Sequence, residues 1–112
     1  MTAPLPVGLV GAGWIGSFHA ETLARRLPGT RLVAVADPVA EAAERLGAAG
    51  TLSATTIYRD PRELIADPSV EAVAICSPAA THADLVVAAA RAGKHVFCEK
   101  PMASTLAEAD RA

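Results

Sequence analysis

The stretch VGLVGAGWIG, residues 7–16, decides the fold. Its first half is a short apolar run typical of a buried strand, and its second half carries glycines in a GxGxxG pattern. The stretch therefore predicts a strand that turns sharply into a helix. Further apolar runs of strand length follow at 31–37, 56–58, 70–76 and 94–98, and helix-like segments separate them.

The helical patterns cover residues 14–27, 39–50, 60–67, 81–93 and 104–112. In the first of them the apolar positions recur at helical spacing, and Pro28 ends it. Those positions are Ile15, Phe18, Thr22, Leu23 and Leu27. Three of the later helices begin with a capping signature, in which a polar N-cap residue precedes an acid by three positions. The pairs are Asp60 with Glu63, Thr81 with Asp84, and Thr105 with Glu108.

Strands that are apolar on both faces and alternate with helices predict a parallel sheet covered on both sides. This is the α/β, doubly wound Rossmann fold, and we expect the strand order 3-2-1-4-5. We count about five strands where a dinucleotide-binding fold has six. Residues 1–112 are therefore expected to form one dinucleotide-binding domain that lacks its final strand.

Composition excludes several classes of function. The chain of 112 residues has 10 basic and 12 acidic side chains and no basic stripe, which argues against nucleic acid or an anionic membrane as a partner. Cys76 and Cys98 lie in apolar runs and are interpreted as buried, inert thiols, so the protein is expected in the reducing cytoplasm. The N-terminus has neither the charge pattern of a signal peptide nor a long apolar span.

The glycine motif predicts a site for NAD. Gly11 allows the tight turn, Gly13 lets the backbone approach a pyrophosphate, and Gly16 lets the helix pack on the strand. Asp37 ends the next strand, where a carboxylate can accept hydrogen bonds from the adenosine ribose. An acid there would repel a 2′-phosphate, and Pro38 and Val39 supply no arginine, so NAD is favoured over NADP.

The residues between the glycines are also assigned to the cofactor. The backbone N–H of Trp14 is expected to face phosphate, and its ring to cover the cofactor or a domain contact. Ile15 stands where a methyltransferase-type GxGxG motif would need a third glycine, which disfavours that reading.

Polar residues follow the fourth and fifth strands. Ligands of open α/β sheets bind outside the carboxyl ends of the strands. Ser77 and Pro78 follow the fourth strand, and Glu99 and Lys100 follow the fifth. We expect all of them at the mouth of the cofactor site.

The motif GAGWIG, Asp37 and the segment CSPAATHADLVVAAARAGKHVFCEKPMA together resemble the N-terminal half of the Gfo/Idh/MocA oxidoreductases. The resemblance covers nearly the whole chain and is strongest at AGKHVFCEKPMA. It implies an NAD-dependent oxidoreductase acting on a secondary hydroxyl of a sugar or cyclic polyol, with inositol as the leading guess. It also implies a C-terminal α/β substrate domain beyond these residues, and a homo-oligomer, dimer or tetramer.

The resemblance further implies roles for the end of the fifth strand. Lys100 would lie beside the nicotinamide and the reacting hydroxyl, Glu99 would orient the site, and the Lys100–Pro101 bond would be cis. The Asp and His that serve the family as orienter and base have no counterpart in this chain, so we expect the chain alone to be inactive.

Other readings stay open. The alternative reading is a non-catalytic dinucleotide-binding module with a redox-sensing or regulatory role. His19 is interpreted as a packing or capping residue, and His95 lies at the wrong end of its strand for chemistry. His82 could shape the site but is more simply a helix-start histidine. Three histidines on separate elements give no spacing typical of a metal site.

Overall fold

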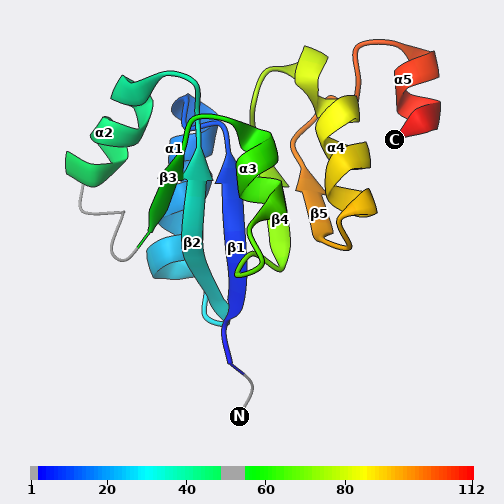
Figure 1. Ribbon diagram of the computed structural model, residues 1–112. Helices are drawn as coiled ribbons and strands as arrows, with labels where there is room; N and C mark the ends of the chain where they lie inside the picture. Colours follow the sequence, from blue (N-terminus) through cyan, green and yellow to red (C-terminus); the bar gives the residue numbers. More distant parts are fainter. Residues whose placement is uncertain (1–2, 49–54) are drawn as a thin grey trace.

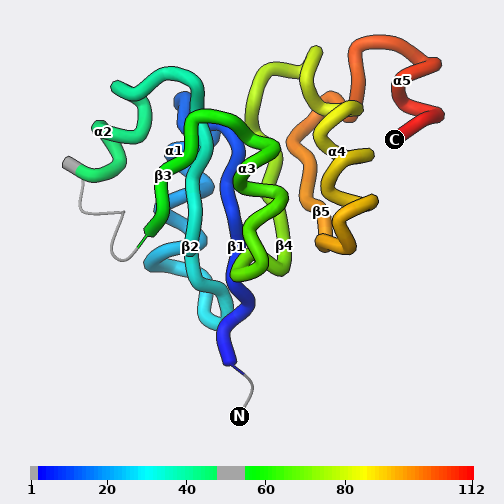
Figure 2. Tube along the Cα trace, viewed as in Figure 1, coloured from blue at the N-terminus to red at the C-terminus, as the bar shows by residue number. Residues whose placement is uncertain are grey.

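The computed structural model describes residues 3–48 and 55–112. Its centre is a sheet of five parallel strands in the order β3-β2-β1-β4-β5, as expected (Figure 1). Figure 2 follows the chain from β1 in the middle outward to β3, then back across the sheet to β4 and β5. The strands are β1 (Leu5–Val10), β2 (Thr30–Ala36), β3 (Thr56–Tyr58), β4 (Ala72–Ile75) and β5 (His95–Cys98).

Helices connect the strands and cover both faces of the central sheet (Figure 1). The α-helices are α1 (Trp14–Glu21), α2 (Ala40–Ala48), α3 (Pro61–Ala66), α4 (His82–Arg91) and α5 (Leu106–Arg111). A π-helical turn, η1 (Thr22–Arg26), extends α1, and a 3₁₀ turn, η2 (Ala79–Thr81), precedes α4. The last residues of the helix expected over 39–50 lie outside the described part of the chain.

The core has two halves, one on each face of the sheet. Val10, Val73 and Ile75 pack with Leu64 of α3 and Leu85 of α4. The other half buries Leu9, Val35 and Ala74 beneath Ala20 of α1 and Leu46 of α2. Neighbouring residues of one strand thus enter opposite halves, which is why the strands read as apolar without alternation.

The helix α1 does not bury all of the apolar positions that recur along it. The helix presents Gly16 and Ala20 to the sheet, while Ile15 and Phe18 remain 42% and 61% exposed. Small side chains allow the helix axis to approach the strands closely, and bulky ones at the same positions would hold it away. The helix therefore buries the face with the small residues Gly16 and Ala20 and leaves the bulkier Ile15 and Phe18 largely exposed.

The expectation that every strand is covered on both sides is wrong for β5. Phe97 is 53% exposed, although α4 packs against the same strand. On the other face a groove of about 300 Å³ runs past Leu23, Ala74 and Phe97. The strand is an edge of the described sheet, and its Cys98 is accordingly half-buried. Cys76, which directly follows β4, is also half-buried and not fully buried as expected.

Two of the three expected caps form. Asp60 accepts a hydrogen bond from the Arg62 N–H at 2.9 Å, and Thr105 accepts one from the Glu108 N–H at 3.2 Å. The cap expected at Thr81 does not form. Its hydroxyl instead donates to the Pro78 carbonyl at 2.7 Å, because the 3₁₀ turn folds it back over the preceding loop.

The loop between β1 and α1 depends on two glycines. Gly11 has φ of +93°, a backbone conformation that side chains disfavour. A Cβ on Gly16 would lie 1.8 Å from the Gly11 carbonyl oxygen, which leaves no room for a methyl group. Gly13 differs, because a Cβ built there meets no atom of the described structure within 4 Å.

We therefore expect Gly16→Ala to lower the free energy of unfolding by at least about 3 kcal/mol, or to prevent folding. Gly13→Ala is the matched control and should change it by less than about 1 kcal/mol. Urea denaturation of both variants measures the difference. Equal stability of the two would contradict the close approach of α1 to the loop.

Candidate functional site

A cavity of about 800 Å³ opens at the carboxyl ends of β1, β2 and β4. It brings together most of the residues that the sequence assigned to a cofactor. These are Gly11, Gly13, Trp14, Ile15, Asp37, Ser77 and Pro78. Gly16 is not among the described residues that line the cavity, and it packs against the carbonyl of Gly11. Trp14 is 89% exposed at the rim, so its ring is accessible to a ligand or to another domain.

The N-terminus of α1 faces this cavity through Gly13, Trp14 and Ile15. The first backbone N–H groups of a helix lack intrahelical acceptors and carry a partial positive charge. Within the described residues no side chain caps α1, and its first turn holds no acid. The helix end thus presents donors to an anion, as a pyrophosphate site requires.

Asp37 is held by the backbone on both sides. Its Oδ2 accepts a hydrogen bond from the Ala12 N–H at 2.7 Å, and its Oδ1 accepts one from the Val39 N–H at 2.8 Å. A carboxylate has about four acceptor sites, so about two remain for hydroxyl groups of a ribose. The side chain therefore also fixes the glycine loop, a second role that the sequence did not reveal.

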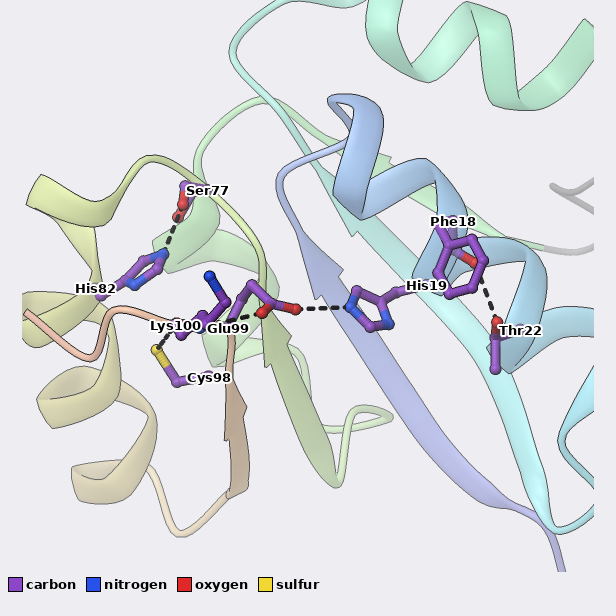
Figure 3. A network of polar contacts seen from close by, with 8 residues as sticks. All are labelled: Phe18, His19, Thr22, Ser77, His82, Cys98, Glu99 and Lys100. Atoms are coloured by element: carbon purple, nitrogen blue, oxygen red, sulfur yellow. Dashed lines mark hydrogen bonds and ion pairs between the residues drawn. The ribbon is translucent and has the colours of Figure 1, made fainter.

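His82 ties two loops together. It is 2% exposed, and its Nε2 and Nδ1 lie 2.6 Å from the carbonyl oxygens of Ser77 and Pro101 (Figure 3 draws the first contact). A neutral imidazole donates only one hydrogen bond, so both contacts are hydrogen bonds together only when both nitrogens carry hydrogen. The loop after β4 and the turn after β5 therefore meet at one buried ring, which is more than a helix-start histidine requires.

Glu99 is joined to α1. Its Oε2 lies 2.8 Å from the Nε2 of His19, and the His19 ring makes an edge contact with Phe97 at 5.5 Å between centroids (Figure 3 shows the His19–Glu99 pair). This hydrogen bond is the main cause that lowers the pKa of Glu99 below its ordinary value of 4.5. The sequence interpretation of His19 as a packing residue missed this contact across 80 positions.

Lys100 is exposed at the end of β5, and the Lys100–Pro101 bond is cis, as the resemblance implied. In Figure 3 its amino group turns away from the His19–Glu99 pair. Glu99 and Lys100 are not among the described residues that line the cavity. Their expected contact with a cofactor therefore stays a prediction.

The thiols are suited to packing. Burial is the main cause that raises the pKa of Cys76 to about 12, and burial also raises the pKa of Cys98. Neither group forms a reactive thiolate near neutral pH. Among residues 3–48 and 55–112, no group of three or more His, Cys, Asp or Glu side chains is placed to hold a metal ion.

Arg62 is a further lining residue that the sequence analysis did not single out. Its signal was available, because it follows the predicted N-cap Asp60 at the carboxyl edge of the sheet. Arg62 and Asp37 line the same cavity because β3 lies beside β2 in the sheet. No local sequence pattern predicts that pairing.

The glycine turn, the uncapped helix and the acid after β2 define a nucleotide-binding domain of the doubly wound α/β class. The chain belongs to the Gfo/Idh/MocA family, since the sequence model of that family matches residues 5–112 and is described as an oxidoreductase family with an NAD-binding Rossmann fold. In the described residues no helix is long and apolar enough to cross a membrane.

Known relatives match nearly all of the chain. It is 44% identical over 109 residues to a myo-inositol 2-dehydrogenase of Thermotoga maritima, covering 94% of this chain and 30% of that protein. It is 38% identical over 104 residues to a scyllo-inositol 2-dehydrogenase (NAD(+)) of Bacillus subtilis, covering 93% and 30%. The chain thus spans about 30% of the length of these relatives.

A solved structure shows the same fold. The myo-inositol dehydrogenase of Lactobacillus casei, in complex with NAD(H) and myo-inositol, superposes with a TM-score of 0.90 at 35% identity. The match covers 96% of this chain and 32% of that one.

We expect His19→Ala to raise the pKa of the Glu99 carboxyl toward 4.5, because the substitution removes the hydrogen bond that stabilises the carboxylate. The lowered pKa means that the pair stabilises the fold above about pH 4.5 and that this contribution is lost as the pH falls through the folded-state pKa. Carbon-13 NMR titration of the Glu99 side-chain carboxyl measures its pKa in the unaltered chain and in His19→Ala.

His95→Ala, at the opposite end of β5, is the control for this titration and should leave the Glu99 titration in place. An unchanged Glu99 titration in His19→Ala would show that the pair does not form in solution.

Proposed function

We propose that this chain is the NAD-binding part of a dehydrogenase that transfers hydride between a secondary hydroxyl of a sugar or cyclic polyol, of the inositol class, and NAD. The single observation that carries the proposal is the cavity in which Asp37 and the uncapped start of α1 lie together. The names of the relatives, inositol 2-dehydrogenases, support the substrate class.

The residues present fit the dinucleotide. Gly11, Gly13, Trp14 and Ile15 would hold the pyrophosphate at the N-terminus of α1, above the packing contact of Gly16. Asp37 would accept hydrogen bonds from the adenosine ribose through the acceptor sites that Ala12 and Val39 leave open. Ser77 and Pro78 would border the cofactor beyond the pyrophosphate, because β4 lies next to β1.

Bound NAD supplies the acceptor for the hydride. Lys100 would lie at the reacting hydroxyl, where an amine can donate a hydrogen bond to the oxygen or share its proton. Glu99 would orient that lysine: its Oε1 accepts a hydrogen bond from the Lys100 backbone N–H at 3.2 Å while Oε2 contacts His19. His82 would fix the turn from its other side through Pro101.

The same proposal places the protein in the cytoplasm as a homo-oligomer, dimer or tetramer, with a small-molecule substrate and neither nucleic acid nor membrane as a partner. Both cysteines are free thiols, which suits a reducing compartment. The nearly balanced charge of the chain supports the exclusion of nucleic acid and membrane as partners.

We expect the chain to bind NAD more tightly than NADP, and Gly13→Ala to weaken NAD binding about tenfold or more. A methyl group at residue 13 has free space in the protein but would occupy the approach of the pyrophosphate. Isothermal titration calorimetry with each nucleotide measures both effects.

The control is Gly47→Ala on α2, where a Cβ also meets nothing within 4 Å but lies away from the cavity. It should leave NAD binding unchanged. A preference for NADP would overturn the role of Asp37, and unaltered NAD binding by Gly13→Ala would overturn the assigned pyrophosphate position.

In a protein that carries this chain together with the remaining length of its relatives, Lys100→Ala should reduce kcat for a polyol at least about 100-fold. The Kd for NAD should change less than about threefold, because the lysine acts on the hydroxyl and not on the dinucleotide. Steady-state kinetics and calorimetry on the same preparation separate the two. Undiminished kcat would show that another group handles the proton, and a purely regulatory module would show no turnover in either form.

A further inference from the structure

Arg62 brings a cation to the cavity that Asp37 also lines. It is the second residue of α3 and lines the cavity together with Pro61, Asp37 and Val39. The Asp60 cap fixes the backbone at this point, since Asp60 Oδ1 accepts the Arg62 N–H at 2.9 Å. The start of the arginine side chain is therefore held in place while the guanidinium stays exposed.

The ends of β2 and β3 are bonded to each other, which brings Arg62 near Asp37. The Asp37 N–H donates to the Tyr58 carbonyl at 3.1 Å, directly beyond the parallel pairing of the two strands. From Tyr58 the chain reaches Arg62 through a short turn. Asp37 and Arg62 therefore follow two neighbouring strands and line the same cavity.

The charged side chains of the cavity differ in what they already contact. Asp84 pairs with Arg111 at 2.6 Å, and both oxygens of Asp37 accept backbone hydrogen bonds. For Arg62, no hydrogen bond or ion pair of the guanidinium occurs within the described residues. It is the one cationic side chain among the described residues that line the cavity.

We propose that Arg62 is a specificity-determining residue that attracts a phosphate on the 2′ position of the adenosine ribose, so that the chain binds NADP measurably although Asp37 favours NAD. The inference rests on the proposed function. A guanidinium forms charge-assisted, bidentate hydrogen bonds with phosphate. A carboxylate next to the same phosphate repels it, so the two side chains act in opposite directions and the discrimination is smaller than Asp37 alone would give.

The test uses Arg62→Gln and two ligands that lack the nicotinamide, ADP-ribose and 2′-phospho-ADP-ribose. Calorimetry at constant ionic strength gives the Kd of each for the 112-residue chain. We expect the unaltered chain to bind both. In Arg62→Gln the affinity for 2′-phospho-ADP-ribose should fall about 3- to 30-fold, while that for ADP-ribose changes less than about twofold.

Arg59→Gln is the matched control. Arg59 lies in the same turn and carries the same charge but does not line the cavity. Arg59→Gln should leave the ratio of the affinities for ADP-ribose and 2′-phospho-ADP-ribose unchanged. If the loss of any positive charge were enough to weaken binding of the phosphate, both variants would change this ratio equally.

The inference is overturned if Arg62→Gln leaves that ratio unchanged, if Arg59→Gln changes it equally, or if the unaltered chain fails to bind 2′-phospho-ADP-ribose. In each of these three cases, if the chain still binds ADP-ribose, the proposed function as an NAD-binding domain is not contradicted. Failure to bind either ligand would overturn both.

Discussion

The rest of the structure depends on the contact between Gly16 and the carbonyl of Gly11, where a side chain of any size is excluded. This contact lets the first turn of α1 lie directly on the loop after β1, so that the helix N-terminus opens into the cavity. It also decides which face of α1 is buried, because a helix held this close admits Ala20 but not Phe18. Binding geometry and core packing therefore have one cause.

The end of β5 is not a solvated exit from the sheet. Glu99 contacts His19 on α1, and the carbonyl of Pro101 contacts His82 at the start of α4. These two contacts reach the turn from opposite sides, and α1 is also the helix that begins at the glycine loop. The position of Lys100 is thus linked, through the protein, to the position of the loop assigned to the pyrophosphate. Under the proposed function, this coupling would hold Lys100 at a defined distance from the bound nucleotide.

Much of the fold could be predicted because it follows from local chemistry. Apolar runs between helical patterns indicate a parallel sheet, and the glycine spacing with Asp37 indicates which strand begins it. The buried face of α1 could not be predicted from periodicity, since the apolar face and the small face differ by only a rotation of the helix. The cap at Thr81 failed for a related reason: its hydroxyl had a nearer acceptor in the carbonyl of Pro78. The contacts of His19 join elements far apart in sequence, and no local signal specifies them.

The double use of Asp37 limits how the nucleotide preference of this domain can vary. The carboxylate, which the proposed function assigns to the ribose, also accepts the hydrogen bond of the Ala12 N–H in the glycine loop. Replacing it to admit a 2′-phosphate would release the loop on which α1 depends, and the penalty would fall on every dinucleotide alike. Arg62 has no such structural duty, since its place is set by its backbone and the Asp60 cap. If Arg62 acts on the 2′-phosphate as proposed, a substitution there would change the nucleotide preference without loosening the glycine loop, whereas a substitution of Asp37 would do both.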